Sequence, residues 1–214
     1  EDGIRDLVRS RGLGDVYKRQ IYGGLQLGND ELESKDLLSP YAVDKYAIEK
    51  YAKVAYLTSN LRSLGLRFFN VYGPRQDPSS PYSGVISVFI NNLLLNQDIT
   101  INGGDQTRDF VYVTDVAGAI VKSLEVLTNN NICDHVNVLT GSSISINDLA
   151  DSLFDLLNSN VQRLYQDLPL GDPLQSSGTT LKLNKLLGVD LNTFIKLDAG
   201  LTKTITHLDS DETI

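Results

Sequence analysis

The chain has 214 residues, a formal net charge of −8 and 41% hydrophobic residues, which fit one large or two small globular domains. The acidic charge argues against a nucleic-acid partner, because nucleic acid requires a basic face. One cysteine, Cys133, excludes an internal disulfide framework and favours a cytoplasmic location. We expect no metal site, since no Cys/His cluster occurs, and no membrane span, since the longest apolar run is too short.

Residues 1–20 (EDGIRDLVRSRGLGDVYKRQ) mix basic and acidic side chains and lack the apolar stretch of a signal peptide. Their last six letters, DVYKRQ, look like a translated transposon end from library preparation. We therefore interpret residues 1–20 as a non-native tail and a sequencing artefact, with a genuine divergent N-terminus as the alternative. The chain has no methionine, even at position 1, which indicates a fragment that begins inside a gene.

Residues 39–51 (SPYAVDKYAIEKY) predict the start of a helix that runs to about residue 61. Ser39 is the candidate N-cap, and Pro40 suits the first helical position. Tyr41 and Lys45 are four residues apart, so they share one face of this helix. An ammonium beside a phenol stabilises the phenolate and lowers the tyrosine pKa, which would make Tyr41 a usable general base.

A second pair, Tyr46 and Lys50, repeats this spacing, but Tyr46 lies about 140° round the helix from Tyr41. The two pairs cannot serve the same site. We favour the first pair because a pocket on the loop side can reach the first turn of the helix. The spacing alone fits equally a surface helix with an ordinary contact between Tyr41 and Lys45.

The rest of the chain alternates predicted strands and helices, which is typical of an α/β fold. Residues 66–71 (LRFFNV) predict a buried parallel strand, followed by a loop at 72–83 that is either a ligand-binding loop or a plain connector. Thr114 or Asp115 is expected to cap a helix, and Ser145 with Asp148 forms a capping box that opens another. Further helices are expected at 84–95, 180–187 and 190–207, and strands at 98–102, 110–113, 135–139 and 161–165, the first two around a turn at 103–107.

Three motifs occur in order along the chain: LSPYAVDKY at 38–46, LRFFNVYGPRQ at 66–76 and QTRDFVYVTD at 106–115. As an ordered set they closely resemble the extended short-chain dehydrogenase/reductase family, in particular its nucleotide-sugar 4-epimerases, over about residues 21–208. The resemblance implies an α/β fold, with the C-terminal part of a Rossmann-like doubly wound sheet plus a smaller α/β substrate-binding lobe. It assigns residues 21–75 and about 110–140 to the remainder of the NAD-binding Rossmann domain, and about 76–109 and 141–214 to the nucleotide-sugar-binding lobe.

The resemblance also implies roles for individual residues. In a complete relative, Tyr41 would take the proton from the sugar 4-hydroxyl while NAD accepts the hydride from C4. Lys45 would hold the tyrosine near its working pKa and bind the nicotinamide ribose. Phe69 corresponds to a residue beside the nicotinamide, although a core phenylalanine fits the sequence equally well. Tyr41 and Lys45 are thus the catalytic candidates, and these two with Phe69 are the cofactor-binding candidates.

Three further residues are substrate-binding candidates by the same resemblance. Asn70 corresponds to a family asparagine that contacts the substrate, and a polar residue at the end of an apolar strand needs partners. Arg108 corresponds to an arginine that meets the nucleotide diphosphate, which suits a bidentate guanidinium. The alternative interpretation of Arg108 is a surface ion pair with Asp109. Arg75 is a weaker candidate for the same contact.

Three features depart from the family pattern. Lys18 stands where relatives have a serine or threonine, four residues before the tyrosine of IYGG, and a lysine cannot relay a hydroxyl proton. The Gly-x-x-Gly-x-x-Gly turn that cradles the dinucleotide has no counterpart, so most of the NAD cradle is missing. Many relatives carry an arginine just before the Gly-Asp of residues 168–172 (LPLGD). Here either another arginine such as Arg163 substitutes or diphosphate binding is weaker.

The expected function of the parent protein is NAD-dependent inversion at C4 of a UDP-hexose, such as UDP-glucose or UDP-N-acetylglucosamine, through a transient 4-keto sugar. A nucleotide-sugar 4,6-dehydratase or a decarboxylase stays open, because its deciding acidic groups would lie beside the missing serine or threonine. A third hypothesis is that this chain is an inactive fragment that at most binds a UDP-sugar. The expected partners are the UDP-sugar substrate and, in the complete parent, a second copy bound through the helix that carries Tyr41 and Lys45.

Overall fold

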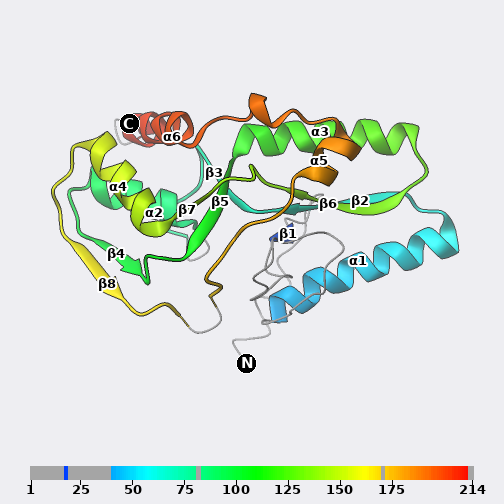
Figure 1. Ribbon diagram of the computed structural model, residues 1–214, viewed down its shortest axis with the longest axis horizontal. Coiled ribbons are helices and arrows are strands. Elements are labelled where there is room, and N and C mark those ends of the chain that lie inside the picture. The colour runs from blue at the N-terminus through cyan, green and yellow to red at the C-terminus, as the bar shows by residue number, and fades with distance from the viewer. Residues whose placement is uncertain (1–16, 19–39, 81–82, 170–171, 212–214) are drawn as a thin grey trace.

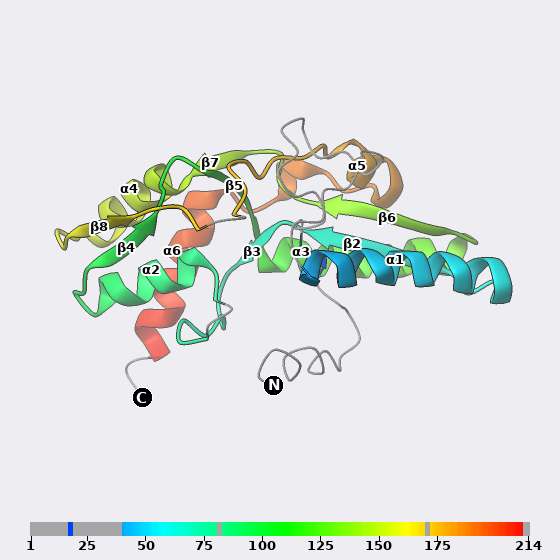
Figure 2. The same cartoon turned by 90° about the horizontal axis from the view of Figure 1, so that it is seen from below.

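The computed structural model describes residues 17–18, 40–80, 83–169 and 172–211. One part is a parallel three-stranded sheet in the order β1-β2-β6, formed by β1 (Tyr17–Lys18), β2 (Ser63–Phe68) and β6 (Cys133–Val138). Its two faces are covered by helices, α1 (Pro40–Ser59) on one side and α3 (Val113–Asn129) with α5 (Leu181–Leu187) on the other (Figures 1 and 2). The three layers confirm the predicted α/β architecture.

Side-chain alternation along β2 gives this sheet two different faces. Leu66 and Phe68 pack with their register partners on β6, Val136 and Val138, in an apolar core shared with α3 and α5. Arg67 lies between Leu66 and Phe68, so its side chain points to the opposite face, toward α1, where it meets a carboxylate of that helix. The face under α1 is therefore the polar face of the sheet.

The other part of the molecule carries two small sheets and three helices. One sheet has the order β3-β5-β7, with β3 parallel and β7 antiparallel to β5, and the second pairs β4 with β8 in parallel. The elements are β3 (Asn70–Tyr72), α2 (Val85–Leu94), β4 (Ile99–Asn102), β5 (Thr107–Tyr112), β7 (Ser143–Ser145), α4 (Ile146–Leu157), β8 (Arg163–Gln166), the 3-10 turn Leu191–Thr193 and α6 (Leu197–Asp211).

This second part has its own apolar core, to which α2, α4 and α6 all contribute. Phe89 and Ile90 of α2 and Leu149 and Leu153 of α4 are buried in it together with Leu201 of α6. The core also takes side chains from both sheets, which are Tyr72, Ile99, Ile101, Phe110 and Tyr112. The helices thus cover strands that run from the first part of the molecule into the second.

Two predicted helix starts are confirmed by the structure. Ser145 is the N-cap of α4, and its side chain accepts a hydrogen bond of 3.0 Å from the backbone N–H of Asp148. Helix α2 starts at Val85, one residue after the predicted start at Gly84, which is its N-cap. The predicted cap of α1, Ser39, lies outside the described residues. Local capping chemistry therefore identified the start of α4.

Strand pairing departs from the sequence prediction in two places. The predicted strand at 66–71 is two strands, β2 and β3, which end and begin on either side of Phe69 and belong to different sheets. The predicted strands at 98–102 and 110–113 do form, as β4 and β5, but they pair with β8 and with β3 and β7 rather than with each other. Apolar runs identify strands, whereas their partners depend on contacts far along the chain.

Two predicted helix boundaries are also corrected. Helix α3 begins at Val113, before both predicted caps, and its N-cap Tyr112 makes no side-chain capping bond. Asp115 instead lies in the first turn, where its carboxylate accepts a hydrogen bond from the backbone N–H of Ile195. The single helix expected at 190–207 is the 3-10 turn followed by α6. In the described ranges, no helix is long and apolar enough to cross a membrane.

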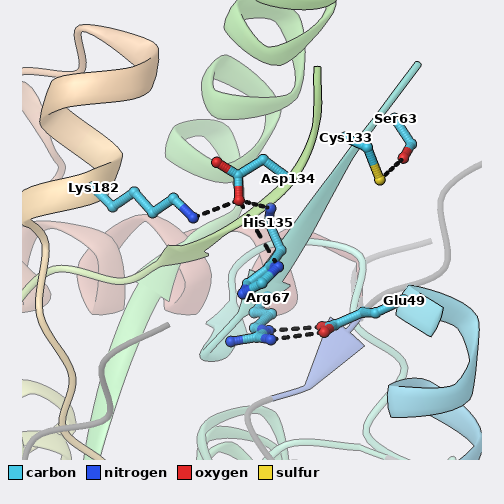
Figure 3. Close-up of polar contacts among 7 residues, drawn as sticks. All are labelled: Glu49, Ser63, Arg67, Cys133, Asp134, His135 and Lys182. Carbon is cyan, nitrogen blue, oxygen red and sulfur yellow. Dashed lines mark hydrogen bonds and ion pairs between the residues drawn. The ribbon is translucent and has the colours of Figure 1, made fainter. Parts of the chain in front are cut away.

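Helix α5 falls within the range that was assigned to the nucleotide-sugar lobe, yet it packs on the three-stranded sheet. Leu183 and Leu187 are buried in the same core as β2 and β6. Lys182 binds Asp134 of β6 at 2.6 Å, which ties the helix to the start of that strand (Figure 3). The domain boundaries drawn from the sequence stay a proposal, and this packing argues for counting α5 with the Rossmann-like part.

Candidate active site

A cavity of about 650 Å³ lies where the loop after β3 meets α2 and β5. Four of the six predicted site residues line it: Phe69, Asn70, Arg75 and Arg108. They come from segments up to 39 residues apart, between residues 69 and 108, so only the fold brings them together. Its position at the carboxyl end of parallel strand β3 is the usual place for a ligand site in α/β folds.

Asn70 is held at the floor of this cavity by its amide nitrogen. Nδ2 donates to the backbone oxygen of Asp109 at 2.9 Å and to Ser176 Oγ at 3.2 Å. Since a backbone oxygen can only accept, these partners fix which way the amide points. Both hydrogens of Nδ2 are used, so the atom that Asn70 can offer to a ligand is Oδ1, a hydrogen-bond acceptor.

Arg108 is a buried cation with a protein carboxylate on one side. Nη2 donates to Asp172 Oδ1 at 2.7 Å, and Nη1 donates to the backbone oxygens of Thr107 and Pro173, each at 2.9 Å. Burial lowers the pKa of the Arg108 guanidinium, while the neighbouring Asp172 carboxylate opposes this decrease. Three of the five N–H groups are used in these bonds. Within the described ranges, the N–H of Nε and one N–H of Nη2 take no part in these bonds, so both can bind a ligand.

The alternative of a surface ion pair between Arg108 and Asp109 is wrong. Asp109 is fully buried and points away, where its carboxylate accepts from Thr140 N and Oγ1, both at 2.9 Å, and from Gly141 N at 2.8 Å. Burial raises the pKa of the Asp109 carboxyl to about 6, although these hydrogen bonds oppose the increase. Asp109 therefore holds the turn before β7 against β5, and Arg108 is available to the cavity.

Arg75 and its neighbours form the rim of the cavity. Arg75 is exposed and has a φ of 68°, a left-handed conformation that is uncommon for a residue with a Cβ. The next residue, Gln76, also lines the cavity, and its Oε1 is buried without a hydrogen-bond partner among the described residues. The first turn of α2 follows, and its N-cap Gly84 has no side chain to accept the backbone N–H groups there.

Tyr41 and Lys45 of α1 are not among the described residues that line this cavity. The Lys45 Nζ lies 5.2 Å from the centre of the Tyr41 ring, as their spacing predicts. Tyr41 is 38% exposed and Lys45 only 7% exposed, so the phenol is accessible above a buried cation. The second pair also forms, with Lys50 Nζ 4.4 Å from the Tyr46 ring centre.

Phe69 connects the cavity with the helix that carries these pairs. It is buried, packs with Leu139 and with Tyr46 of α1, and lines the cavity on its other side. The two readings of Phe69, core residue and site residue, are thus both compatible with its position. The six predicted residues form two groups, Asn70, Arg75 and Arg108 in the cavity and Tyr41 with Lys45 on α1, with Phe69 between them.

Sequence reasoning missed three features of the cavity. Asp172 was assigned no contact, although it is the ion-pair partner of Arg108. Gln76 and the N-cap Gly84 were not singled out as site residues, although both line the cavity. The sequence held a signal for Gly84, because a glycine that precedes an apolar helix offers no capping side chain. Such a helix start leaves backbone N–H groups for a ligand.

Arg163 does not replace the arginine that many relatives carry before the Gly-Asp. It binds Asp151 of α4, and its guanidinium stacks 4.1 Å from the centre of the Phe154 ring. It is not one of the residues that line the cavity. Arg163 therefore packs β8 against α4, and Arg108 is the buried arginine of the cavity.

Comparison with known proteins places the chain in a family. Residues 19–138 match the family model described as the NAD dependent epimerase/dehydratase family. A Methanocaldococcus jannaschii protein provisionally named UDP-glucose 4-epimerase is 46% identical over 76% of this chain and 50% of its own length. A UDP-N-acetyl-alpha-D-glucosaminuronate decarboxylase of Bacillus cytotoxicus is 33% identical over 50% of this chain and 32% of its own.

Among solved structures, a UDP-N-acetylglucosamine 4-epimerase of Methanobrevibacter ruminantium, in complex with UDP-N-acetylmuramic acid, is similar at a TM-score of 0.83 and 32% identity. The match covers 92% of this chain and 63% of that one. The chain spans about half the length of the curated M. jannaschii relative. On the family match and this structural likeness, the chain belongs to the NAD dependent epimerase/dehydratase family, within the extended short-chain dehydrogenases/reductases.

Proposed function

We propose that this chain supplies the sugar-nucleotide cavity and the Tyr41–Lys45 pair of an NAD-dependent epimerase that inverts C4 of a UDP-hexose. The observation that carries the proposal is the cavity itself, in which Arg108 and Asn70 converge beside the first turn of α2. The relatives named for UDP-glucose and UDP-N-acetylglucosamine 4-epimerases support this reading. Cytoplasmic location and homodimer formation of the complete parent belong to the same proposal.

The cavity suits a nucleoside diphosphate linked to a hydroxylated sugar. The two unused N–H groups of Arg108 can bind phosphate oxygens, and the uncapped N–H groups at Gly84 and Val85 offer a second set of donors. Asn70 Oδ1 can accept a hydrogen bond from a sugar hydroxyl. Arg75 at the rim can add a positive charge for the diphosphate.

Tyr41, Lys45 and Phe69 would serve the nicotinamide end of the cofactor. The residues present fit only the nicotinamide end of NAD. They provide an accessible phenol, a buried ammonium under it and a phenylalanine between this helix and the cavity. NAD, when bound, supplies a reversible hydride acceptor for C4. Tyr41 takes the proton of the 4-hydroxyl and returns it, and Lys45 stabilises the phenolate and holds the ribose. The dinucleotide cradle has no counterpart in the sequence.

The test measures binding of UDP-glucose to the 214-residue chain by calorimetry, with UDP as a second ligand. The Arg108→Met variant removes two charge-assisted hydrogen bonds, so the affinity should fall about tenfold to hundredfold. Arg163→Met is the matched control, because it removes an arginine that pairs with Asp151 outside the cavity. Equal affinity of the Arg108→Met variant and the unmodified chain, with both folded by circular dichroism, would refute the proposal.

A second candidate is a decarboxylase or dehydratase acting on the same kind of UDP-sugar, which the B. cytotoxicus relative supports. In the complete parent, incubation with NAD and either UDP-glucose or UDP-glucuronic acid separates a decarboxylase from an epimerase, since only decarboxylation releases carbon dioxide. We expect no turnover by this chain alone, because Lys18 stands where a hydroxyl is needed and the dinucleotide turn is missing. Epimerisation of UDP-glucose by the 214-residue chain would contradict that expectation.

A further inference from the structure

The helix that carries Tyr41 and Lys45 is attached to the sheet by a buried ion pair. Arg67, the residue before the last of β2, is fully buried, and Glu49 of α1 is nearly so, with 11% of its side chain exposed. The guanidinium binds the carboxylate as a fork, Nε to Oε1 at 2.7 Å and Nη2 to Oε2 at 2.7 Å (Figure 3). A buried charge that loses its partner is strongly destabilising, so this contact allows α1 little freedom to slide or rotate.

Glu49 lies on the same stripe of α1 as the Tyr–Lys pair. Tyr41, Lys45 and Glu49 are spaced by four residues each, so they follow one another along one face of the helix. The Lys45 ammonium lies one turn from the Tyr41 ring on one side and one turn from the Glu49 carboxylate on the other. A carboxylate and a phenol are therefore two candidate partners for the same ammonium.

The two partners are not equal competitors for Lys45. A carboxylate is charged at neutral pH and attracts an ammonium four residues away on a helix. In the structure both oxygens of Glu49 are engaged by Arg67, which neutralises this carboxylate. The Lys45 ammonium is found instead over the Tyr41 ring, 5.2 Å from its centre.

We propose that Arg67 is a positioning residue that keeps Lys45 on Tyr41 by holding the Glu49 carboxylate away from it. The inference rests on the proposed role of the Tyr41–Lys45 pair and adds to that site a residue from outside both the helix and the cavity. Arg67 is not among the described residues that line the cavity. It acts through Glu49, from the polar face that the alternation of β2 turns toward α1.

The test reads the pH at which the Tyr41 phenol ionises, by carbon NMR of the chain labelled at tyrosine Cζ, with the signal assigned by Tyr41→Phe. Arg67→Met leaves Glu49 without its partner, so Lys45 should move to the carboxylate. The ionisation midpoint of Tyr41 should then rise by about 0.5 to 2 pH units, because a unit positive charge is withdrawn from about 5 Å away. Adding Glu49→Gln to Arg67→Met removes the competitor and should restore the midpoint.

Rescue by the second substitution separates positioning from a merely structural role. A structural role predicts that the Arg67→Met and Glu49→Gln/Arg67→Met variants behave alike, which would overturn the proposal, as would an unchanged midpoint in Arg67→Met. If Arg67→Met does not fold, Arg67→Gln gives the same comparison, because an uncharged amide cannot neutralise the Glu49 carboxylate. The Tyr46 signal is the internal control, since its partner Lys50 is not a turn away from Glu49.

The same variants distinguish this inference from the proposed function. Arg67 and Glu49 are not among the residues that line the cavity, so UDP-glucose affinity should stay within about twofold in both variants. Absence of UDP-glucose binding by the unmodified chain would count against the proposed function and leave the NMR comparison intact. Binding with no change at Tyr41 would overturn the role of Arg67 alone.

Discussion

A single methyl group at Gly200 of α6 should destabilise the protein, although alanine is the better helix former. A Cβ at Gly200 would lie 2.8 Å from Tyr72 Cζ and 3.0 Å from Tyr112 Cδ2, and closer still to the Tyr72 hydroxyl. Real Cβ atoms essentially never approach other atoms under 3.0 Å. Tyr72 is buried in the second core and donates to the backbone oxygen of Leu197 at 3.3 Å, so it cannot swing aside freely.

The magnitude follows from two opposing contributions. Overpacking a core costs about 1 to 3 kcal/mol, whereas replacing glycine by alanine inside a helix contributes about 1 kcal/mol. Gly200→Ala should therefore lower the free energy of unfolding by up to about 2 kcal/mol. Gly118 in the middle of α3 is the matched control, because its Cβ would meet nothing within 4 Å. Gly118→Ala should raise the free energy of unfolding by about 0.5 to 1 kcal/mol.

The assay is urea unfolding followed by circular dichroism, with both variants and the unmodified chain under the same conditions. Adding Tyr72→Phe to Gly200→Ala removes the closest atom and should recover part of the loss relative to Tyr72→Phe alone, because the contact with Cζ remains. A Gly200→Ala variant as stable as Gly118→Ala would mean that α6 is not packed on Tyr72 as described. The close approach of this helix to β3 would then be wrong.

Two further predictions concern the segments around the cavity. Because the pKa of buried Asp109 is raised to about 6, its stabilising contribution is present below about pH 4 and lost as the pH rises through 6, a change of about 3 kcal/mol. Urea unfolding at pH 4.5 and pH 7 should show about 2 kcal/mol of this change in the unmodified chain, because part of it is already lost at pH 4.5, and no such change in Asp109→Asn. Ser145→Ala removes the N-cap of α4 and should cost about 1 kcal/mol in the same assay, whereas Ser152→Ala, on the exposed side of that helix, should cost under about 0.5 kcal/mol.

The parts of the fold that could be predicted from sequence are those with local causes. The cap at Ser145 and the start of α2 after Gly84 depend on a few neighbouring residues, and both were located to within one residue. The division of residues 66–71 at Phe69 could not be located this way. It depends on β2 pairing with β6 and β3 pairing with β5, that is, on partners about 40 to 70 residues away.

The candidate site shows the same difference between features with local causes and features that depend on distant residues. Asn70 and Arg108 could be picked out as polar residues in a family motif, and both line the cavity. What each side chain binds was not predictable, because Asp172 and Ser176 reach them from a loop 64 and 106 residues along the chain. An ion pair of Arg108 with the adjacent Asp109 was the alternative that the sequence left open. Strand alternation excludes it, since neighbours on β5 point to opposite faces.

Helix α1 gives the clearest case of a face that hydrophobic patterning cannot describe. Its side toward the sheet includes Ala42, Lys45 and Glu49, where an ordinary helix of an α/β fold would present aliphatic side chains. An apolar face tolerates small rotations, because dispersion contacts are exchanged for similar ones. A forked ion pair does not, because any displacement leaves a buried charge unpaired. A polar face here thus favours one orientation of α1, the one that leaves the Tyr41 phenol accessible above Lys45.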